Sequence, residues 1–230
     1  MTTVIIAVSC TLVGTLHDEY LDNGQEEPPA ELPKMTITLT KSGNVTFGIS
    51  GSGSITINWG DGSATQTYNI SSGNTNLTHS GSGSRTITIS GANITRLDCS
   101  DNQVTQINVS EITTLTHLFC NDNELTGLDV SANNRLAMLL CDDNRLTALN
   151  VGENTTLSFL NISFNNMQNA SLNALLSSLH ANNITGGKTV IISNNAGTAS
   201  PQSINTAINR GWEVVETPPI QTFSKIKNQK

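Results

Sequence analysis

The sequence predicts a mainly β protein: a small N-terminal β-sandwich, then a solenoid of short repeats, then a C-terminal cap that contains two short helices. Three observations carry this prediction. Residue types recur every 21 positions between Ile94 and Asn165. Apolar and polar residues alternate as in strands between Met35 and Gly91. After Asn165 the 21-residue step breaks, and apolar residues appear at helical spacing.

The repeated unit keeps one residue type at many of its positions. It reads Leu-x-x-Leu-x-Cys-x-x-Asn-x-Leu-x-x-Leu-x-Val from Leu115 to Val130. This is the leucine-rich-repeat pattern at its short period. The two most distinctive columns are Cys99, Cys120 and Cys141, continued by Ile162, and Asn102, Asn123, Asn144 and Asn165.

A single unit of this length does not fold alone. Burying roughly six aliphatic side chains contributes about 1.5–3 kcal/mol each, whereas ordering about 21 residues costs on the order of 1–2 kcal/mol apiece. Stacked units bury their apolar edges against both neighbours. We therefore expect a short parallel strand at 118–120, with Leu118 and Cys120 pointing inward and His117 and Phe119 outward. The side-chain amide of Asn123 should bond backbone groups in the turn that follows.

The first 34 residues read as a signal or lipobox remnant followed by an acidic tether. The apolar start, 1–14, is too short to span a bilayer. Its segment Ala7-Val8-Ser9-Cys10 resembles a bacterial lipobox. The resemblance implies lipidation of Cys10; a plain signal remnant or a disordered tail is the alternative. Residues 18–34 are acidic and proline-bearing with few apolar groups, which predicts a solvated segment.

Residues 35–92 carry alternating runs separated by Gly, Ser and Asn clusters, which is typical of a small antiparallel sandwich. The run from Trp59 to Ser63, Trp-Gly-Asp-Gly-Ser, predicts a tight turn in which Asp61 bonds its own backbone. With His79, this run resembles the PKD-like immunoglobulin fold, and the resemblance implies that fold here. A single carboxylate at Asp61 is too few for calcium. Because Asn93 follows without a linker, we expect this module to cap the first repeat.

Residues 93–171 hold the repeats, 172–216 the C-terminal repeat and cap, and 217–230 a polar tail. Ser171 is the candidate N-cap of a helix through Leu179. Asn195 then restores the strand-plus-Asn pattern, so this helix is an insertion in one coil. A second helix should begin at Ser200-Pro201 and end at Gly211. Its expected inward residues are Ile204, Ala207 and Ile208, and the last strand is expected at 212–215.

Taken whole, the chain resembles leucine-rich-repeat surface proteins of anaerobic Gram-negative bacteria, with internalins as more distant relatives. The resemblance implies export, display at the cell surface or outer membrane, and binding, without naming a ligand. A formal net charge of −7 gives no basic footprint for nucleic acid. The membrane is expected to be reached only through the lipid anchor.

The sequence offers little reactive chemistry. It contains neither a Gly-x-Ser-x-Gly elbow nor a phosphate-binding glycine loop, so we expect no enzyme activity and no cofactor. Inward cysteines and the outward His117 cannot share a zinc ion. A disulfide straight across parallel neighbours would be strained, so we expect buried free thiols. The aspartate column at Asp101, Asp122 and Asp143 is either a solvated acidic rim or a calcium site.

Outward strand positions supply the candidate binding site. Alternation gathers apolar side chains on the open sheet face, flanked by Arg96, Asp98 and Asp142. Such patches mark interaction sites, and aromatic residues anchor interfaces; a patch covered by the tether or tail is the alternative. The candidate ligand-binding residues are His117, Phe119, Met138, Leu140 and Phe159.

These residues predict a non-enzymatic surface protein that binds a protein ligand, host proteins included, or acts in adhesion. The alternative function is a carbohydrate-associated or spacer module, in which the sandwich contacts glycan and the solenoid is scaffold. For that function Trp59, Tyr68 and Phe47 would have to present their rings.

Overall fold

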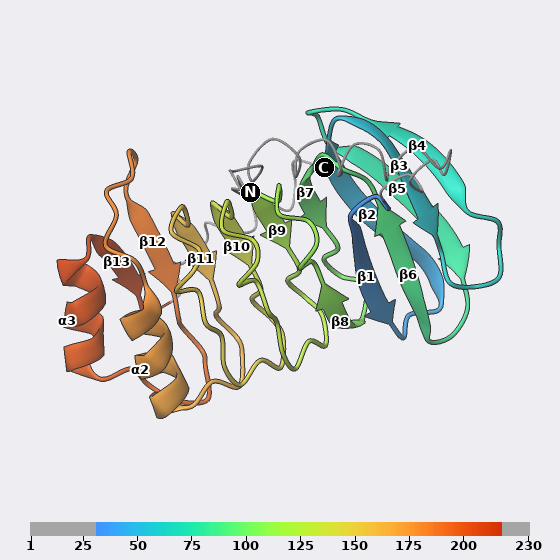
Figure 1. The fold of residues 1–230 in the computed structure, drawn as a ribbon. Coiled ribbons are helices and arrows are strands. Elements are labelled where there is room, and N and C mark those ends of the chain that lie inside the picture. The colour runs from blue at the N-terminus through green and yellow to red at the C-terminus, as the bar shows by residue number, and fades with distance from the viewer. Residues whose placement is uncertain (1–30, 218–230) are drawn as a thin grey trace, which may run out of the picture. The chain divides into compact units, whose positions relative to one another are not determined.

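The computed structural model describes residues 31–217, so the predicted lipidation at Cys10 and the tail at 218–230 lie outside the described residues. The chain is mainly β, with two sheets and two described helices (Figure 1). A five-stranded sheet has the order β4 (Gln66–Ile70), β3 (Gly53–Asn58), β6 (Arg85–Ser90), β1 (Lys34–Leu39) and β8 (Val104–Asn108).

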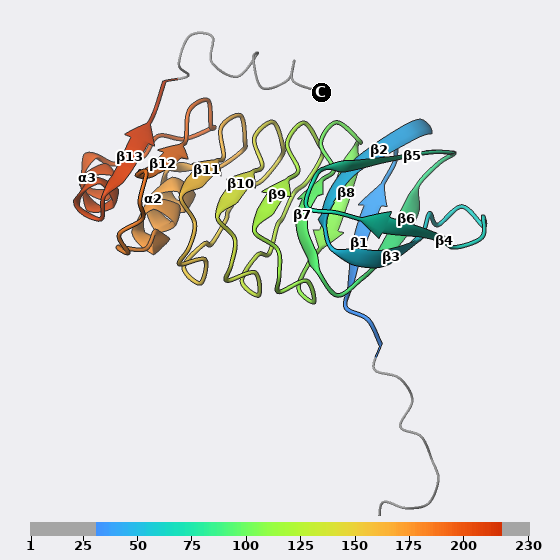
Figure 2. The same cartoon turned by 90° about the horizontal axis from the view of Figure 1, so that it is seen from above.

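The larger, eight-stranded sheet runs along the coils, as the view from above makes plain (Figure 2). Six of its strands, β7 and β9 to β13, pair in parallel, and each contributes one coil. Its order is β13 (Trp212–Val215), β12 (Lys188–Ile191), β11 (Phe159–Asn161), β10 (Met138–Leu140), β9 (His117–Phe119), β7 (Ile94–Asp98), β2 (Gly43–Gly51) and β5 (Thr75–Gly81).

The register of this sheet follows the repeat. His117 pairs with Met138 and Met138 with Phe159, each 21 residues further along the chain. The predicted parallel strands are therefore confirmed, although β9 begins one residue earlier than expected. Leu118, Leu139 and Leu160 point into a continuous apolar core and are fully buried.

The N-terminal strands are joined to the first coil at two places. Strand β2 pairs antiparallel with β7 and so extends the solenoid sheet. Strand β1 pairs antiparallel with β8, which lies in the same coil after its turn. The backbone of Gly51 passes so close to the Asn93 carbonyl oxygen that a Cβ would lie 2.1 Å from it, and only glycine fits such an approach.

The asparagine column forms the ladder that the sequence predicts. The side chain of Asn144 is 8% exposed, and its Nδ2 donates to the carbonyl oxygens of Cys120, Cys141 and Asp142 at 2.9, 3.3 and 3.1 Å. Its Oδ1 accepts the Leu125 N–H at 2.9 Å. One side chain thus serves backbone groups of its own coil and of the preceding coil, which would otherwise be buried without partners.

Both ends of the ladder are closed. At the first coil, Asn102 exchanges two hydrogen bonds with the Thr46 backbone of β2, at 3.3 and 3.0 Å, because no earlier repeat is available. At the other end of the ladder, Asn195 of the β12 coil donates to the carbonyl oxygens of Ile162 and Ile192 at 2.9 and 3.0 Å. The restored strand-plus-Asn pattern predicted near Asn195 is therefore confirmed.

The backbone conformation explains why aspartate recurs in the column of Asp101, Asp122 and Asp143. Its members stand in the left-handed region, with φ between 50° and 58°, at the turn directly before each ladder asparagine. Asp and Asn tolerate this conformation better than other non-glycine residues. The full column is Asp101, Asp122, Asp143, Phe164 and Asn194.

The turn predicted at Trp59 to Ser63 is confirmed. Gly60 and Gly62 have φ of 72° and 85°. The Ser63 N–H donates to Asp61 Oδ1 at 3.0 Å, and His79 Nε2 lies 2.6 Å from Asp61 Oδ2. Hydrogen bonds from the Ser63 side chain first, then from His79 and the Ser63 backbone, hold the pKa of Asp61 well below its ordinary value.

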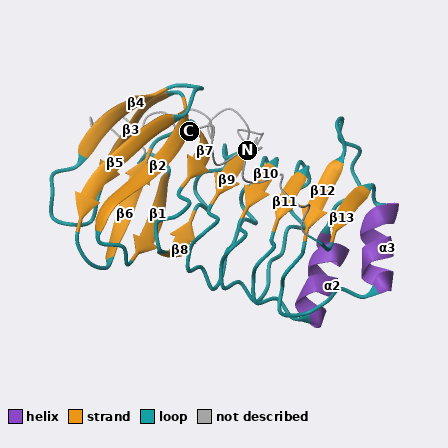
Figure 3. Ribbon diagram, turned by 180° about the vertical axis from the view of Figure 1, so that it is seen from behind, coloured by secondary structure: helices purple, strands orange, loops and turns teal. Residues whose placement is uncertain are grey.

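Two C-terminal expectations are wrong. Helix α2 (Asn169–Ser178) has Gln168 at its N-cap, without a side-chain cap, and not Ser171. Its start is set instead by the following loop, because Asn169 Oδ1 accepts the Thr198 N–H at 2.9 Å. Helix α3 (Pro201–Asn209) buries Ala207, but Ile208 is 51% exposed. Helix α3 packs against α2 and β13, and Figure 3 shows it beside them.

Other predictions for this region are confirmed. Ser200 caps α3 by accepting the Ser203 N–H at 3.2 Å, Gly211 follows at φ 82°, and 212–215 form the last described strand. Behind them, His180 Nε2 donates to the Leu157 carbonyl oxygen at 2.7 Å, and its Nδ1 accepts the Asn182 N–H at 3.1 Å. This arrangement requires the neutral imidazole.

Asn144→Ala should lower the free energy of unfolding by about 3 kcal/mol, because it leaves buried backbone groups without partners. Urea unfolding followed by circular dichroism measures this change. Asn150→Ala is the matched control: its exposed side chain accepts only the Gly152 N–H at 3.0 Å, so a loss under about 1 kcal/mol is expected. Equal losses in the two variants would contradict the ladder's role.

His180 should make the fold acid-sensitive. Burial lowers the pKa of His180 from its ordinary 6.5, the bond to Leu157 opposes this shift, and the charge of Lys188 adds to it. Below pH 6.5 the unfolded chain therefore binds the proton first, and stability falls until the pH passes the folded pKa. Unfolding free energies at pH 7 and pH 5 should differ less in His180→Gln than in the parent. An identical difference would rule out this group.

Candidate functional site

The strand register places the candidate residues in two adjacent rows on the outer face of the solenoid sheet. The first row contains Arg96, His117, Met138 and Phe159, one from each of β7, β9, β10 and β11. The second row contains Asp98, Phe119, Leu140 and Asn161. The structure thus brings all five predicted residues together, at neighbouring positions of four consecutive strands.

At one end of this patch, Phe119 is packed between a cation and an imidazole. The Arg96 guanidinium carbon lies 4.4 Å from the Phe119 ring centre. The rings of His117 and Phe119 meet edge to face, with centres 6.2 Å apart. Arg96 Nη2 also lies 3.8 Å from Asp98 Oδ2. These contacts fix the orientation of the Phe119 ring in the absence of a ligand.

His117 is held as a neutral group. Its Nδ1 lies 2.8 Å from Thr116 Oγ1, and Thr116 Oγ1 also lies 2.9 Å from the Thr95 carbonyl oxygen. Burial lowers the pKa of His117, and the charge of Arg96 acts in the same direction. Arg96 and Asp98 are the basic and acidic side chains within the two rows.

The five candidate side chains are partly exposed, and none belongs to the large apolar residues that are most exposed in the described chain. Contacts between neighbouring side chains, such as those of Arg96 and His117 with Phe119, cover part of the surface of the patch. At the β11 end of the second row, Asn161 is only 4% exposed, and Ser163, two residues later, is 5% exposed. Strand alternation alone would place both side chains on the open face. Asn161 Oδ1 folds back to accept the Ser163 hydroxyl at 2.7 Å.

One exposed aromatic residue, Phe164, is not among the residues that the sequence predicts for a binding site. Phe164 is 48% exposed and stands in the left-handed column, with φ 53°. A bulky side chain is an outlier in this conformation. The signal was present in the sequence, because Phe164 lies 21 residues after Asp143 and replaces a residue type that tolerates the turn.

Aromatic rings for glycan binding are scarce among the N-terminal strands. Phe47 and Trp59 are fully buried, with stacked rings 5.9 Å apart, and Trp59 also stacks on His79 at 4.6 Å. Tyr68 is half-buried and donates its hydroxyl to Gln66. Two of the three rings required by the alternative function are therefore inaccessible.

The cysteine column is buried and free. Cys99, Cys120 and Cys141 have no exposed surface and form no disulfide. Burial raises the pKa of each thiol well above its ordinary value, so each remains protonated. In residues 31–217, no group of three or more His, Cys, Asp and Glu side chains is arranged to hold a metal ion.

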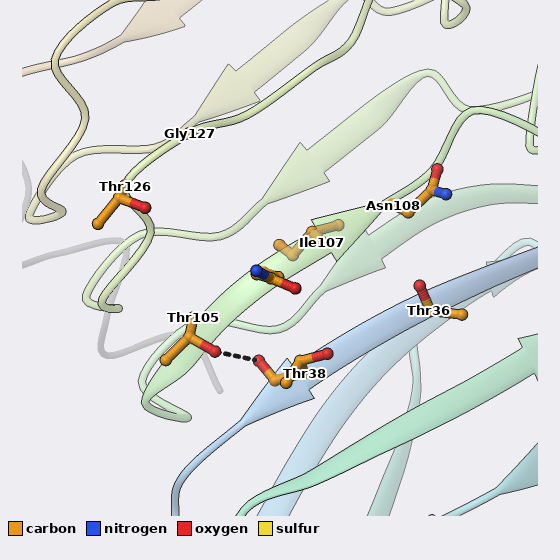
Figure 4. Close-up of a pocket in the computed structure, with 8 residues that line it drawn as sticks. Thr36, Thr38, Thr105, Ile107, Asn108, Thr126 and Gly127 are labelled. Carbon is orange, nitrogen blue, oxygen red and sulfur yellow. Dashed lines mark hydrogen bonds between the residues drawn. The ribbon is translucent and has the colours of Figure 1, made fainter.

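Two shallow cavities lie near the junction of the N-terminal strands and the coils. The first has a volume of about 290 Å³ and carries no charged side chain (Figure 4). In Figure 4, Thr105 of β8 donates its hydroxyl to the Thr38 carbonyl oxygen of β1, at 3.3 Å. The second has a volume of about 470 Å³ and is lined by Gly51, Ser52, Ser72, Asn93, Thr95, Thr114, Thr116 and Arg135.

None of the helices in the described part of the chain is long and apolar enough to cross a membrane.

Two solved structures from Listeria monocytogenes are similar to parts of this chain. The functional domain of InlJ, which includes a cysteine ladder, is 33% identical over 50% of this chain and 23% of that chain, with a TM-score of 0.40. The internalin inlF is 17% identical over 53% of this chain and 46% of that chain, with a TM-score of 0.35. The chain spans less than half the length of either structure. No protein-family model matches the sequence, and no curated protein does so either.

Proposed function

We propose that this chain is a non-enzymatic binding protein of the bacterial cell surface, which engages a protein partner through the outer face of the solenoid sheet. The proposal rests on one observation: the rows of apolar and aromatic side chains on β9, β10 and β11. The contact residues are His117, Phe119, Met138, Leu140 and Phe159.

The geometry suits a protein surface better than a small molecule. The rows span four strands about 4.8 Å apart, which gives a broad area, and neither of the two cavities described above is lined by the five residues. Small-molecule sites are concave by contrast. Phe119 is already oriented by Arg96 and His117, so little side-chain freedom is lost when a partner covers it.

The remaining residues support this surface. Residues 35–92 act as a PKD-like sandwich that caps the first coil through β2 and β1, and 172–216 close the last coil. The export signal and the lipid anchor at Cys10 belong to the same proposal. In this proposal the sheet face serves in adhesion to host proteins.

Phe119→Ser combined with Phe159→Ser should weaken partner binding at least about 30-fold, because aromatic anchors dominate interface energies. Both rings are partly exposed, so the fold should survive with a loss of about 1–2 kcal/mol each. Binding of the chain to an array of extracellular proteins and glycans, followed by biolayer interferometry on the hits, measures the effect.

Phe164→Ser is the matched control, since Phe164 is an exposed phenylalanine of the same coil that lies outside the two rows. It should leave partner affinity unchanged. Affinity retained in the double variant, or lost equally in Phe164→Ser, would show that the face has been assigned wrongly. Glycan hits retained in the double variant, with no protein hit in the parent chain, would favour the N-terminal strands as the binding site.

A further inference from the structure

The larger junction cavity is lined by polar groups of two opposite kinds. Three of them are threonine hydroxyls that already donate to backbone carbonyl oxygens. Thr114 donates to Ile94 at 2.7 Å, and Thr116 to Thr95 at 2.9 Å. Thr95 makes a longer bond to Ser50, at 3.4 Å. With its hydrogen engaged, each hydroxyl can offer only an oxygen lone pair to a ligand.

Arg135 supplies the opposite character. It occupies the 21-residue column of Thr114 and Thr156, whose hydroxyls both bond the backbone of the preceding coil. Arg135 has no hydroxyl group, and it lines the cavity as an exposed cation. It forms no ion pair with any residue of 31–217, and the cavity lining contains no carboxylate.

A ligand that complements this cavity brings hydrogen-bond donors to the threonines and an oxyanion to Arg135. Sugar hydroxyls supply the donors, and a carboxylate or sulfate on the ring supplies the anion. The cavity is shallow, with a volume of about 470 Å³, so it would contact one side of a sugar unit and leave the other in solvent. Because the lining contains no aromatic ring, recognition rests on hydrogen bonds and charge.

We propose that this cavity, between the N-terminal strands and the first three coils, binds an acidic sugar unit of a glycan. Thr95, Thr114 and Thr116 accept from the sugar hydroxyls, and Arg135 holds the oxyanion. The site is separate from the sheet face of the proposed function, and Thr116 connects the two because it also contacts His117. Neither site requires the other to be occupied.

The proposal is tested by titrating the chain with three oligosaccharides of equal length: an oligogalacturonate, a sulfated galactose oligomer and a neutral galactose oligomer. Amide shifts in NMR spectra report the site. At least one acidic oligomer should bind and shift the amides of Ser52, Thr114 and Thr116. The neutral oligomer should bind at least about tenfold more weakly, and the comparison of the two acidic oligomers identifies the oxyanion.

Arg135→Gln should weaken the acidic oligomer about tenfold or more. Arg145→Gln should not weaken it, because Arg145 is an exposed arginine already paired with Glu124 at 3.4 Å. Thr114→Val, which keeps the side-chain shape, should also weaken binding. Polyglutamate tests whether any carboxylate suffices. The proposal is overturned by no binding at about 10 mM, by equal affinity for the neutral oligomer or polyglutamate, or by equal losses in the two arginine variants.

Discussion

The architecture depends on the buried amide of the asparagine at the end of each strand. Five of the six described coils turn there in the left-handed conformation, and the turn leaves carbonyl and N–H groups facing an apolar core. Asn123, Asn144 and Asn165 satisfy these groups within their own coil and across to the neighbouring coil. Because one side chain bonds two coils, it fixes both the turn and the spacing of the stack. Asn133 and Asn154 form a second pair of buried amides, and each donates to two carbonyl oxygens of the preceding coil.

This constraint explains which columns are fixed by packing and which are free to vary. The cysteine column points into the core beside the ladder, where a small apolar side chain fits, and Ile162 serves equally well. The outward columns do not pack in this core, so their residue types vary from coil to coil. The sheet holds four of these outward residues in rows on adjacent strands: Phe119, Met138, Leu140 and Phe159. Arg135 arises in the same way, as the exception in a threonine column.

Sequence periodicity predicted what the repeat controls, and failed where distant segments decide. The parallel strands, the inward cysteines and the Asn102 to Asn165 ladder followed from a 21-residue step with strand alternation. The pairing of β8 with β1 had no local signal, because Val104 and Ile107 look like ordinary repeat positions. The start of α2 was missed since Gln168 makes no cap, and the contact at Thr198 replaces it. The five candidate residues were placed correctly, yet their half-burial depends on contacts such as Arg96 on Phe119, which alternation does not reveal.

Hydroxyl-radical footprinting of the chain, free and bound to its protein partner, tests the central assignment most directly, because it reports the solvent exposure of Met, Phe and His side chains. The account predicts that the partner lowers modification of Met138, Phe119 and Phe159, and leaves Phe164 as reactive as in the free chain. Unchanged modification of the first three residues, with protection confined to other parts of the chain, would contradict the assignment of the sheet face as the binding surface.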